Sequence, residues 1–368
     1  MEYDIFNPPE EKPYDKYKIN LYEYDINKYI NYGRVGYYHI CFRNQSKQYF
    51  LLKVYQKSKI LKNKEYEKYL KELQFYIDFQ SNKFFPLFKG INTDNPKYLS
   101  FLFEFMPGGT LKNLLSTKKN FKTEESKFYL LNIIKIFEYL HDNYIIYRDI
   151  KPENIFIRKN GYVTILDFSL CKKLDILHNL STKTICNKPN YVAPEMILNK
   201  YYSFKVDSWM LGVFFYEMII GKDPFYNKDT YLIYQNIIKC KIKFPKNIEK
   251  DVKNLINCML NVNVDKRFGL NEIKAHKLFI DFKWNLFENQ ILHAPFIPSE
   301  DINPLFYYNN DKKNKKIFEK WEKIKEDRNK FNENDDNMKF KFNNEVEIIN
   351  DDEEAESIEK SEDPFLNW

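Results

Sequence analysis

One short stretch, residues 147–154, constrains what this chain can fold into more than any other part of it. It reads Tyr-Arg-Asp-Ile-Lys-Pro-Glu-Asn, and a second acidic motif, Asp-Phe-Ser, follows at residues 167–169. An aspartate that orients a hydroxyl, a lysine and an asparagine close behind it, and a second aspartate after a short hairpin form a set suited to phosphoryl transfer. An ordinary polar loop is the alternative interpretation, but the order and spacing of these groups favour a phosphoryl-transfer site.

The chain before this stretch predicts a small antiparallel sheet and one main helix. Residues 37–42 and 49–55 are apolar and aromatic runs separated by a polar turn, which is typical of a hairpin. Apolar residues recur at helical spacing over residues 65–79. A further buried strand is expected over residues 99–106, and the Pro-Gly-Gly sequence that follows it suits a hinge.

Beyond this hinge the pattern changes to helices. A long apolar-periodic stretch is capped at Thr123, and two short strands, residues 155–158 and 162–166, are joined by an Asn-Gly turn. A loop of roughly 25 residues with no obvious element follows, and so long a loop inside a domain is usually functional. Helices are then expected at residues 204–221, 229–239, 250–260 and 270–276.

Composition argues against several classes of function. Acidic and basic residues are mixed along most of the chain, so its net charge of +6 indicates a soluble surface rather than a nucleic-acid-binding one. The five cysteines show no paired metal-ligand spacing, which fits reduced thiols inside a cell. The chain shows no signal-like N-terminus and no apolar run that could span a bilayer. We therefore expect no nucleic-acid partner, no membrane association and an intracellular, cytoplasmic location, with the nucleus left open.

Five strings carry a resemblance to a known family. They are residues 147–154, Asn-Tyr-Val-Ala-Pro-Glu at 190–195, Val-Asp-Ser-Trp-Met-Leu-Gly at 206–212, Asp-Lys-Arg-Phe-Gly at 265–269 and Ala-Pro-Phe-Ile-Pro at 294–298. With these strings, nearly the whole chain resembles the AGC group of eukaryotic protein kinases, and within that group it is most similar to the catalytic subunit of cyclic-AMP-dependent protein kinase. A tyrosine rather than a histidine before Arg148 is one of the AGC features.

The resemblance implies an α+β, two-lobed protein kinase fold. A small antiparallel β lobe with one main helix would precede a large, mostly helical lobe and an AGC-type C-terminal tail. The expected divisions are an N-terminal extension at 1–24, a kinase domain at 25–285 with lobes at 25–106 and 107–285, and the tail at 286–368. The tail carries a charged insert and ends in a hydrophobic motif, Phe365 and Trp368, which would dock on the small lobe.

The resemblance also implies a role for each group of the first stretch. Asp149 would accept or orient the proton of the substrate hydroxyl, and Lys151 would neutralise charge on the transferred phosphoryl group. Asn154 and Asp167 would hold Mg²⁺ through oxygen ligands. The reaction implied is the transfer of phosphate from ATP to protein serine or threonine.

A second group of residues would bind ATP. Lys53, in the second strand of the predicted hairpin, would contact the α and β phosphates and pair with Glu72 of the predicted helix. A solvated surface pair is the alternative for these two residues, but their placement on a strand and a helix favours the active-site pair. The other residues implied in the ATP pocket are Gly33, Gly36, Tyr38, Leu51, Glu104, Met106 and Phe156.

Further residues match positions for regulation and substrate choice. Thr184 matches an activation-loop phosphosite, with an ordinary loop threonine as the alternative. The basic residues implied around its phosphate are Arg148, Lys172 and Lys68. Glu153 and Glu217 match acids that bind an arginine before the phosphoacceptor, so protein substrates with basic Ser/Thr sites are implied. An apolar pocket for the residue after the acceptor would be lined by Ile185, Pro189 and Val192. The other partners implied are an upstream kinase and a regulatory subunit.

Departures from the family pattern keep a second hypothesis open. Asn31 replaces the first glycine of the glycine-rich loop, and Ser169 replaces the glycine of Asp-Phe-Gly. Bulky side chains such as Tyr38 crowd the ATP pocket, and overpacking costs roughly 1–3 kcal/mol. Lys188 replaces a threonine that normally bonds Asp149. The competing hypothesis is a pseudokinase or very slow kinase that acts as a binding or scaffold protein. A nucleic-acid-binding kinase-like protein, a third, rests on net charge alone.

Overall fold

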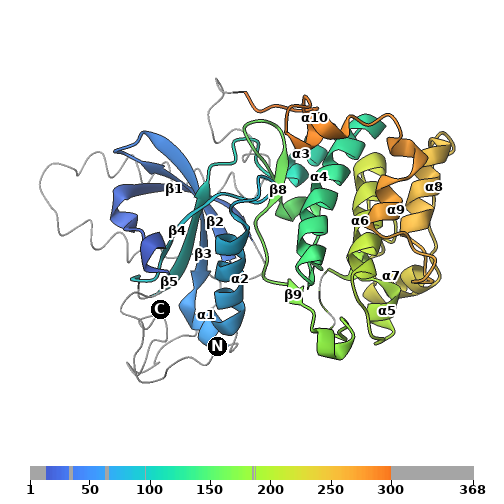
Figure 1. Cartoon of the computed structure of the whole chain (residues 1–368), viewed down its shortest axis with the longest axis horizontal. Coiled ribbons are helices and arrows are strands. Elements are labelled where there is room, and N and C mark those ends of the chain that lie inside the picture. Colours follow the sequence, from blue (N-terminus) through green and yellow to red (C-terminus); the bar gives the residue numbers. More distant parts are fainter. Residues whose placement is uncertain are drawn as a thin grey trace, which may run out of the picture.

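The computed structural model of the chain has two lobes (Figure 1). A small lobe built on a β-sheet lies on one side and a larger, helical lobe on the other, which confirms the predicted two-lobed α+β fold. The structure describes residues 14–32, 36–62, 66–95, 97–184, 186 and 188–299. The predicted sites Gly33, Ile185, Phe365 and Trp368 lie outside the described residues, as does the predicted tail beyond residue 299.

The sheet of the small lobe is antiparallel, with the strand order β1-β2-β3-β5-β4. Its strands are β1 (Tyr24–Tyr32), β2 (Gly36–Arg43), β3 (Gln48–Gln56), β4 (Phe88–Asn92) and β5 (Tyr98–Glu104). The predicted hairpin is formed by β2 and β3. Alternation along β3 places Leu51 and Tyr55 in the main core and Leu52 and Val54 in a separate cluster on the other face. Lys53 therefore shares the face of Leu51 and Tyr55.

Helix α2 (Tyr66–Phe79) packs on that face of the sheet. Its buried residues recur every three or four positions and are Tyr69, Glu72, Leu73, Tyr76 and Phe79. The rings of Tyr69 and Tyr55 are 4.6 Å apart between centroids, which fixes the helix against β3. Glu72 is a charged residue in an otherwise apolar stripe, so it needs a partner inside the protein.

Several short elements of the small lobe were not predicted. They are β4 and α1 (Lys57–Lys62), which are too short to show a clear period. Residues 15–17 and 21–23, expected to be irregular, form 3₁₀ turns. Between these turns Lys18 bridges to Ile91 of β4, so the described part of the N-terminal extension lies along the edge of the sheet.

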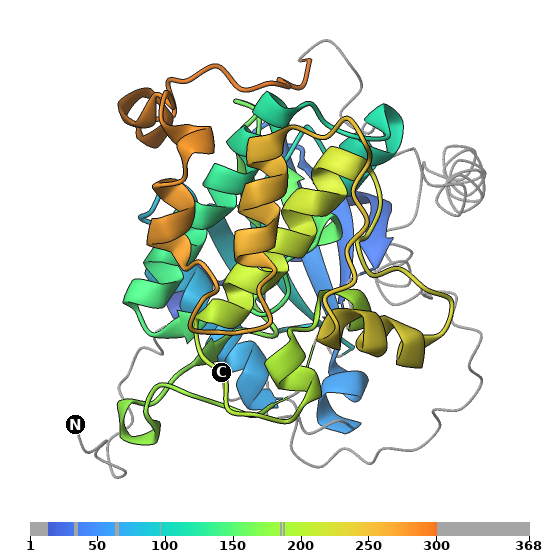
Figure 2. The same cartoon turned by 90° about the vertical axis from the view of Figure 1, so that its right-hand side faces the viewer.

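Two long helices, α4 (Thr123–Asp142) and α6 (Lys205–Ile220), form the centre of the large lobe. The remaining helices are α3 (Leu111–Lys118), α5 (Pro194–Ile197), α7 (Thr230–Ile238), α8 (Lys250–Met259), α9 (Leu270–Lys274) and α10 (Trp284–Glu288). Figure 1 shows α6 between α4 and α8, and in Figure 2, where the right-hand side of that view faces the reader, α8 lies in front of α6. Every residue of α6 from 206 to 218 is buried, as expected for a central helix. The predicted helices are confirmed as α4, α6, α7, α8 and α9.

The start of α4 differs slightly from the prediction. Thr123 is the first helical residue rather than the cap, and Lys122 holds the cap position. The carboxylate of Glu125 accepts a hydrogen bond from the Lys122 N–H at 2.9 Å, so it satisfies a backbone donor at this end of the helix.

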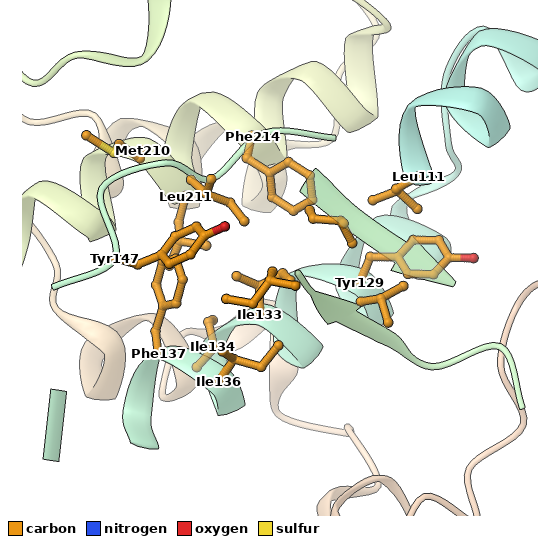
Figure 3. Packing of buried hydrophobic residues seen from close by; sticks show 14 of the residues in the cluster. Leu111, Tyr129, Ile133, Ile134, Ile136, Phe137, Tyr147, Met210, Leu211 and Phe214 are labelled. Carbon is orange, nitrogen blue, oxygen red and sulfur yellow. The ribbon is translucent and has the colours of Figure 1, made fainter. Parts of the chain in front are cut away.

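The first residue of the stretch 147–154, Tyr147, lies inside the core of the large lobe. Figure 3 shows Tyr147 in a cluster with Phe137 of α4 and Leu211 of α6. The rings of Tyr147 and Phe137 are 5.4 Å apart between centroids, and the side chain of Tyr147 is fully buried. Packing by Tyr147 therefore fixes the position of the polar residues that follow it.

Short strands frame the same residues. The predicted hairpin is β7 (Ile155–Ile157) and β8 (Val163–Ile165), and its turn includes Gly161 with a φ of 79°. The following loop, expected to hold no element, contains β9 (Lys172–Lys173), which pairs with β6 (Ile145–Ile146). Two residues carry no period that could reveal such a strand. In the described part of the chain, no helix combines the length and the apolar character needed to cross a membrane.

Candidate active site

A buried ion pair joins β3 to α2. Lys53 Nζ lies 2.7 Å from Glu72 Oε1, and the two side chains are 1% and 0% exposed. The hydroxyl of Tyr55 donates to Glu72 Oε2 at 2.8 Å. Both carboxylate oxygens of Glu72 therefore have partners, which a buried charge requires.

Asp167 approaches Lys53 from the large lobe. Its Oδ1 lies 3.4 Å from Lys53 Nζ. Burial opposes the charged form of Lys53, but Asp167 and Glu72 outweigh it and raise the pKa of the ammonium. Burial likewise opposes the charged form of Asp167, but Lys53 and hydrogen bonds from Ser169 lower its pKa to about 2. Both groups are therefore charged at neutral pH.

Tyr76 connects this ion pair to the Asp-Phe-Ser motif. Its hydroxyl lies 2.7 Å from Glu72 Oε1 and 2.5 Å from the carbonyl oxygen of Leu166. The backbone N–H of Phe168 donates to Glu72 Oε1 at 3.2 Å. The sequence did not predict this role for Tyr76, although its spacing of four residues from Glu72 on α2 was the available signal.

Asp149 is held by two side chains of its own loop. Lys151 Nζ lies 2.9 and 2.8 Å from the two carboxylate oxygens. The amide nitrogen of Asn154 donates to Asp149 Oδ2 at 2.7 Å and to the Asp149 carbonyl at 3.1 Å. Burial raises the pKa of Asp149 to about 6, against the attraction of Lys151. The carboxylate is mostly ionised at neutral pH and can accept a hydrogen bond from a hydroxyl.

Asp207 of α6 holds the backbone just before Asp149. Its carboxylate accepts hydrogen bonds from the N–H groups of Tyr147 at 2.9 Å and Arg148 at 2.8 Å. Arg148 has a φ of 67°, a left-handed conformation that costs energy for a residue other than glycine. His141 Nε2, in the last turn of α4, lies 2.8 Å from Asp207 Oδ2 and was not predicted. These contacts stabilise the strained backbone beside Asp149.

Asn154 and Asp167 offer the oxygen atoms that Mg²⁺ prefers. Because the Asn154 nitrogen donates to Asp149, the amide oxygen points away from that carboxylate. Asp167 is ionised, as its low pKa shows. Among the described residues, no group of three or more His, Cys, Asp or Glu could hold a metal ion. The two oxygens fit a Mg²⁺ ion that takes its remaining ligands from phosphates and water.

The side chains implied in the ATP pocket pack against one another. Tyr38 is 3% exposed, and Leu51, Met106 and Phe156 are 0% exposed. The rings of Tyr38 and Phe156 are 5.2 Å apart between centroids, and Lys53 Nζ lies 5.7 Å from the centroid of Tyr38. The side chains implied in adenine binding are therefore buried against one another, with Tyr38 in contact with Phe156.

Two other residues implied in ATP binding lie at the ends of strands. Gly36 opens β2 and pairs with Tyr55 of β3. The carboxylate of Glu104, at the end of β5, lies 3.0 Å from Arg158 and accepts a hydrogen bond from the Leu87 N–H at 3.0 Å. The Glu104 carboxylate therefore connects β5 to Arg158, the residue directly after β7. Its role toward ATP stays a prediction.

Two implied phosphate-binding residues reach Thr184 through bridging hydroxyls. Arg148 donates to the Tyr202 hydroxyl at 3.0 Å, and that hydroxyl donates to the Thr184 carbonyl. Lys172 donates to the Thr182 hydroxyl at 2.7 Å. The Thr182 hydroxyl in turn lies 3.4 Å from the Thr184 hydroxyl. The structure therefore brings two basic groups close to Thr184.

The third implied basic residue, Lys68, lies on α2 with its ammonium 5.6 Å from the ring centroid of Tyr69. Its part in phosphate binding stays a prediction. Partial burial lowers the pKa of Lys172, and repulsion from Arg148 and Lys71 lowers it further. Lys71, which the sequence did not predict, therefore acts on the same cationic region from α2.

A lysine lies between the two acids implied in substrate binding. Lys112 Nζ of α3 is 3.2 Å from Glu217 Oε1 and 3.9 Å from Glu153 Oε1. The Tyr191 hydroxyl donates to Glu217 Oε2 at 2.6 Å, and Lys188 Nζ lies 3.9 Å from Glu153 Oε1. The structure thus brings the two acids together, and the lysine between them was not predicted.

The implied apolar pocket is described only in part. Val192 is 1% exposed and Pro189 is half-buried, and the part of both residues in substrate binding stays a prediction. A stronger structural feature follows directly after Val192, where Glu195 of α5 forms a bidentate ion pair with Arg267. This pair anchors the segment to the large lobe.

Comparison with known families agrees with this geometry. The sequence profile of the protein kinase domain matches residues 24–279. The chain belongs to the protein kinase family.

This kinase is similar in sequence to cyclic-nucleotide-dependent protein kinases of other organisms. It is 34% identical over 289 residues to a cGMP-dependent protein kinase of Drosophila melanogaster. It is 31% identical over 286 residues to cAMP-dependent protein kinase type 3 of Saccharomyces cerevisiae, and 32% identical over 284 residues to a cAMP-dependent protein kinase catalytic subunit of Mus musculus. These relatives confirm the predicted similarity to AGC kinases of the cyclic-AMP-dependent type.

The alignments cover different shares of each protein. Each spans 76% of this kinase. The same segment covers 30% of the Drosophila protein, 70% of the yeast protein and 78% of the mouse protein. The kinase therefore matches less than a third of the length of the Drosophila relative.

Shortening Tyr38 is expected to tighten ATP binding by this kinase. Tyr38→Val removes the ring that packs 5.2 Å from Phe156, while valine keeps the β-branched shape that strands favour. Relief of roughly 1–3 kcal/mol of overpacking should lower the Kd for ATP by about tenfold. Isothermal titration with ATP measures this change. Tyr37→Val, a change at a buried neighbour on the opposite strand face, is the control, and an unchanged Kd for Tyr38→Val would show that Tyr38 does not obstruct the pocket.

Proposed function

We propose that this kinase transfers the γ-phosphate of ATP to serine or threonine hydroxyls of proteins in a Mg²⁺-dependent reaction. One observation carries the proposal: Lys53 is paired with Glu72 and lies 3.4 Å from Asp167. That contact links the small lobe to the segment that follows the Asp149 loop. An ammonium held in this way suits phosphate binding, because its charge is fixed and buried.

The residues of the site divide the chemistry among them. Asp149 accepts a hydrogen bond from the substrate hydroxyl and orients it toward the phosphate. Lys151, 2.8 Å from Asp149, offsets negative charge as the phosphoryl group moves. Lys53 neutralises phosphate oxygens on the side of Asp167. Asn154 and Asp167 would hold Mg²⁺, which would supply further neutralisation of the phosphate charge.

The test is direct phosphate transfer by the purified chain of residues 1–368, phosphorylated at Thr184. Radiolabelled ATP and Mg²⁺ are supplied with a basic peptide of the Arg-Arg-x-Ser type, and thermal unfolding is followed with and without Mg²⁺-ATP. We expect labelled peptide and a raised Tm, both lost in Asp167→Ala. Circular dichroism of that variant checks that it remains folded. The proposed function would be overturned if the unmodified sequence gave neither labelled peptide nor a raised Tm.

Activity is expected to fall in acid with an apparent pKa of about 6. Burial raises the pKa of Asp149 above its ordinary value, so protonation occurs at a higher pH than for an exposed aspartate. The ionised fraction increases as pH rises through the pKa, and kcat/KM should increase with it. Because kcat/KM reports groups of the free enzyme, its profile from about pH 5 to 8 is the measurement. A flat profile would contradict the role of Asp149.

We further propose that phosphorylation of Thr184 by an upstream kinase activates the enzyme. Thr184→Ala is expected to lower kcat/KM by roughly tenfold or more, because a phosphate could form several charge-assisted hydrogen bonds with Arg148 and Lys172. Intact-mass measurement and kinetics of the same sample make the comparison. Ser181→Ala, which removes another hydroxyl of the loop, is the control. Full activity of Thr184→Ala, or of protein without phosphate, would contradict this regulation.

The substrate class and other partners are further parts of the proposal. The acids Glu153 and Glu217 support the proposal that the substrates are proteins with a basic residue before the phosphoacceptor. A regulatory subunit is proposed from the similarity to cyclic-AMP-dependent kinases. Cys41, Cys171, Cys240 and Cys258 are free thiols, which supports an intracellular, cytoplasmic location, with the nucleus left open.

A second candidate function is a pseudokinase that binds or scaffolds other proteins. The packing of Tyr38 against Phe156, with Leu51 fully buried beside them, favours it, because these side chains fill the region implied for adenine. Phosphate transfer by Tyr38→Val, measured beside its ATP titration, separates the two functions. A pseudokinase would stay inactive even when that variant binds ATP, whereas an obstructed kinase would gain phosphate transfer.

A further inference from the structure

The acids implied in substrate recognition already share a cation from within the chain. Glu217 is 7% exposed, and both of its oxygens have partners: Oε1 meets Lys112 at 3.2 Å and Oε2 accepts from Tyr191 at 2.6 Å. Burial alone would lower the pKa of Lys112, but attraction to Glu217 and Glu153 outweighs it and raises the pKa. Lys112 therefore presents a permanent positive charge at this site.

The second acid is engaged less completely. Glu153 Oε1 lies 3.9 Å from both Lys112 and Lys188, at the outer limit of an ion pair. Among the described residues, Glu153 Oε2 is buried and has no hydrogen-bond partner. A cation that reached both acids would thus find Glu153 only weakly engaged and would have to displace Lys112 from Glu217.

Lys112 can leave the site at modest cost. Its side chain is 39% exposed, and its long, flexible stem can turn the ammonium toward water. The backbone of α3 would not have to move, because Thr110 caps the helix independently by accepting a hydrogen bond from the Asn113 N–H at 3.3 Å. Lys112 therefore acts as a removable occupant of the acidic site rather than as a permanent part of its wall.

We propose that Lys112 is a specificity-determining residue that competes with a basic side chain of the substrate for Glu217 and Glu153. This inference rests on the proposed function, because it assigns the two acids to substrate binding. Competition weakens the advantage of an arginine before the phosphoacceptor. The kinase then accepts serine and threonine sites that lack a basic neighbour more readily than the acids alone would allow.

The test compares substrate selection by Lys112→Met, Lys112→Arg and the unmodified sequence. A positional-scanning library of Ser/Thr peptides measures transfer and preference together. Lys112→Met keeps an unbranched stem without the charge, and Lys112→Arg restores a cation. Lys118→Met is the matched control, because Lys118 lies on the same helix and pairs with Glu125 instead. Tm values show whether each variant is folded.

Lys112→Met is expected to increase the preference for arginine before the acceptor by roughly tenfold, the effect of one charge-assisted hydrogen bond. The gain should come mainly from a lower KM for the arginine peptide. Lys112→Arg and Lys118→Met should select as the unmodified chain does. Transfer with an unchanged arginine preference in Lys112→Met would overturn the inference alone, as would an equal change in kcat for all peptides. Absence of transfer to any peptide by every protein, the unmodified chain included, would overturn the proposed function and the inference with it.

Discussion

Replacing Asp149 by asparagine is expected to lower kcat by roughly 10²- to 10⁴-fold, the range for loss of a positioned acid–base group. Asparagine keeps the size of the side chain, so the loop held by Asp207 should not change. The amide, however, is neutral and cannot take up the proton of a substrate hydroxyl, and its NH₂ group donates hydrogen bonds where the carboxylate oxygen accepted them. The Kd for ATP should change little, because Lys53 and Asp167 are untouched. Steady-state transfer and ATP titration measure the two quantities.

Asp142→Asn provides the matched control for this prediction. Asp142 is an exposed aspartate at the end of α4, five residues before the loop begins, so its substitution makes the same chemical change away from the site. Its kcat should remain within about twofold of the unmodified value. If Asp149→Asn kept a comparable kcat, Asp149 would have no part in the chemistry. If it lost ATP binding as well, the change would act through the fold rather than the hydroxyl.

Prediction from sequence worked best where long elements carry the site. The sequence predicted both the strand with Lys53 and the helix with Glu72, and β3 and α2 span 9 and 14 residues. Segments of that length show a clear period, which assigns each residue to a face. The structure then brings Lys53 and Glu72 together because their two buried faces pack against each other.

Short elements and long-range contacts could not be derived in the same way. Strand β9 has two residues, too few for any period. Lys112 meets Glu217 across 105 residues of sequence, and one of two lysines in an eight-residue helix gives no sign of that partner. Tyr76 reaches the Leu166 carbonyl across 90 residues. Such contacts follow from how α2, α3 and α6 pack, and local patterns do not encode that packing.

Breaking the buried ion pair between Arg267 and Glu195 is expected to have the largest effect on stability. The guanidinium donates to both carboxylate oxygens, at 2.6 and 2.8 Å, and the side chains are 0% and 5% exposed. Arg267→Met should lower the free energy of unfolding by about 3–5 kcal/mol, because it leaves the Glu195 charge buried and unpaired. Urea denaturation measures this loss. Lys266→Met, at the exposed neighbour, should stay within about 0.5 kcal/mol of the unmodified chain.

A second change at Glu195 separates the ion pair from the other contacts of Arg267. The guanidinium also donates to the carbonyls of Asn261 and Lys205, both at 2.9 Å, and those bonds are lost whenever Arg267 is replaced. Adding Glu195→Gln to Arg267→Met removes the stranded charge, so the double variant should be more stable than Arg267→Met alone. Equal stability of the two would place the cost in the carbonyl contacts instead. The anchoring of α5, and with it the segment after Thr184, would then depend on hydrogen bonds to the backbone rather than on charge.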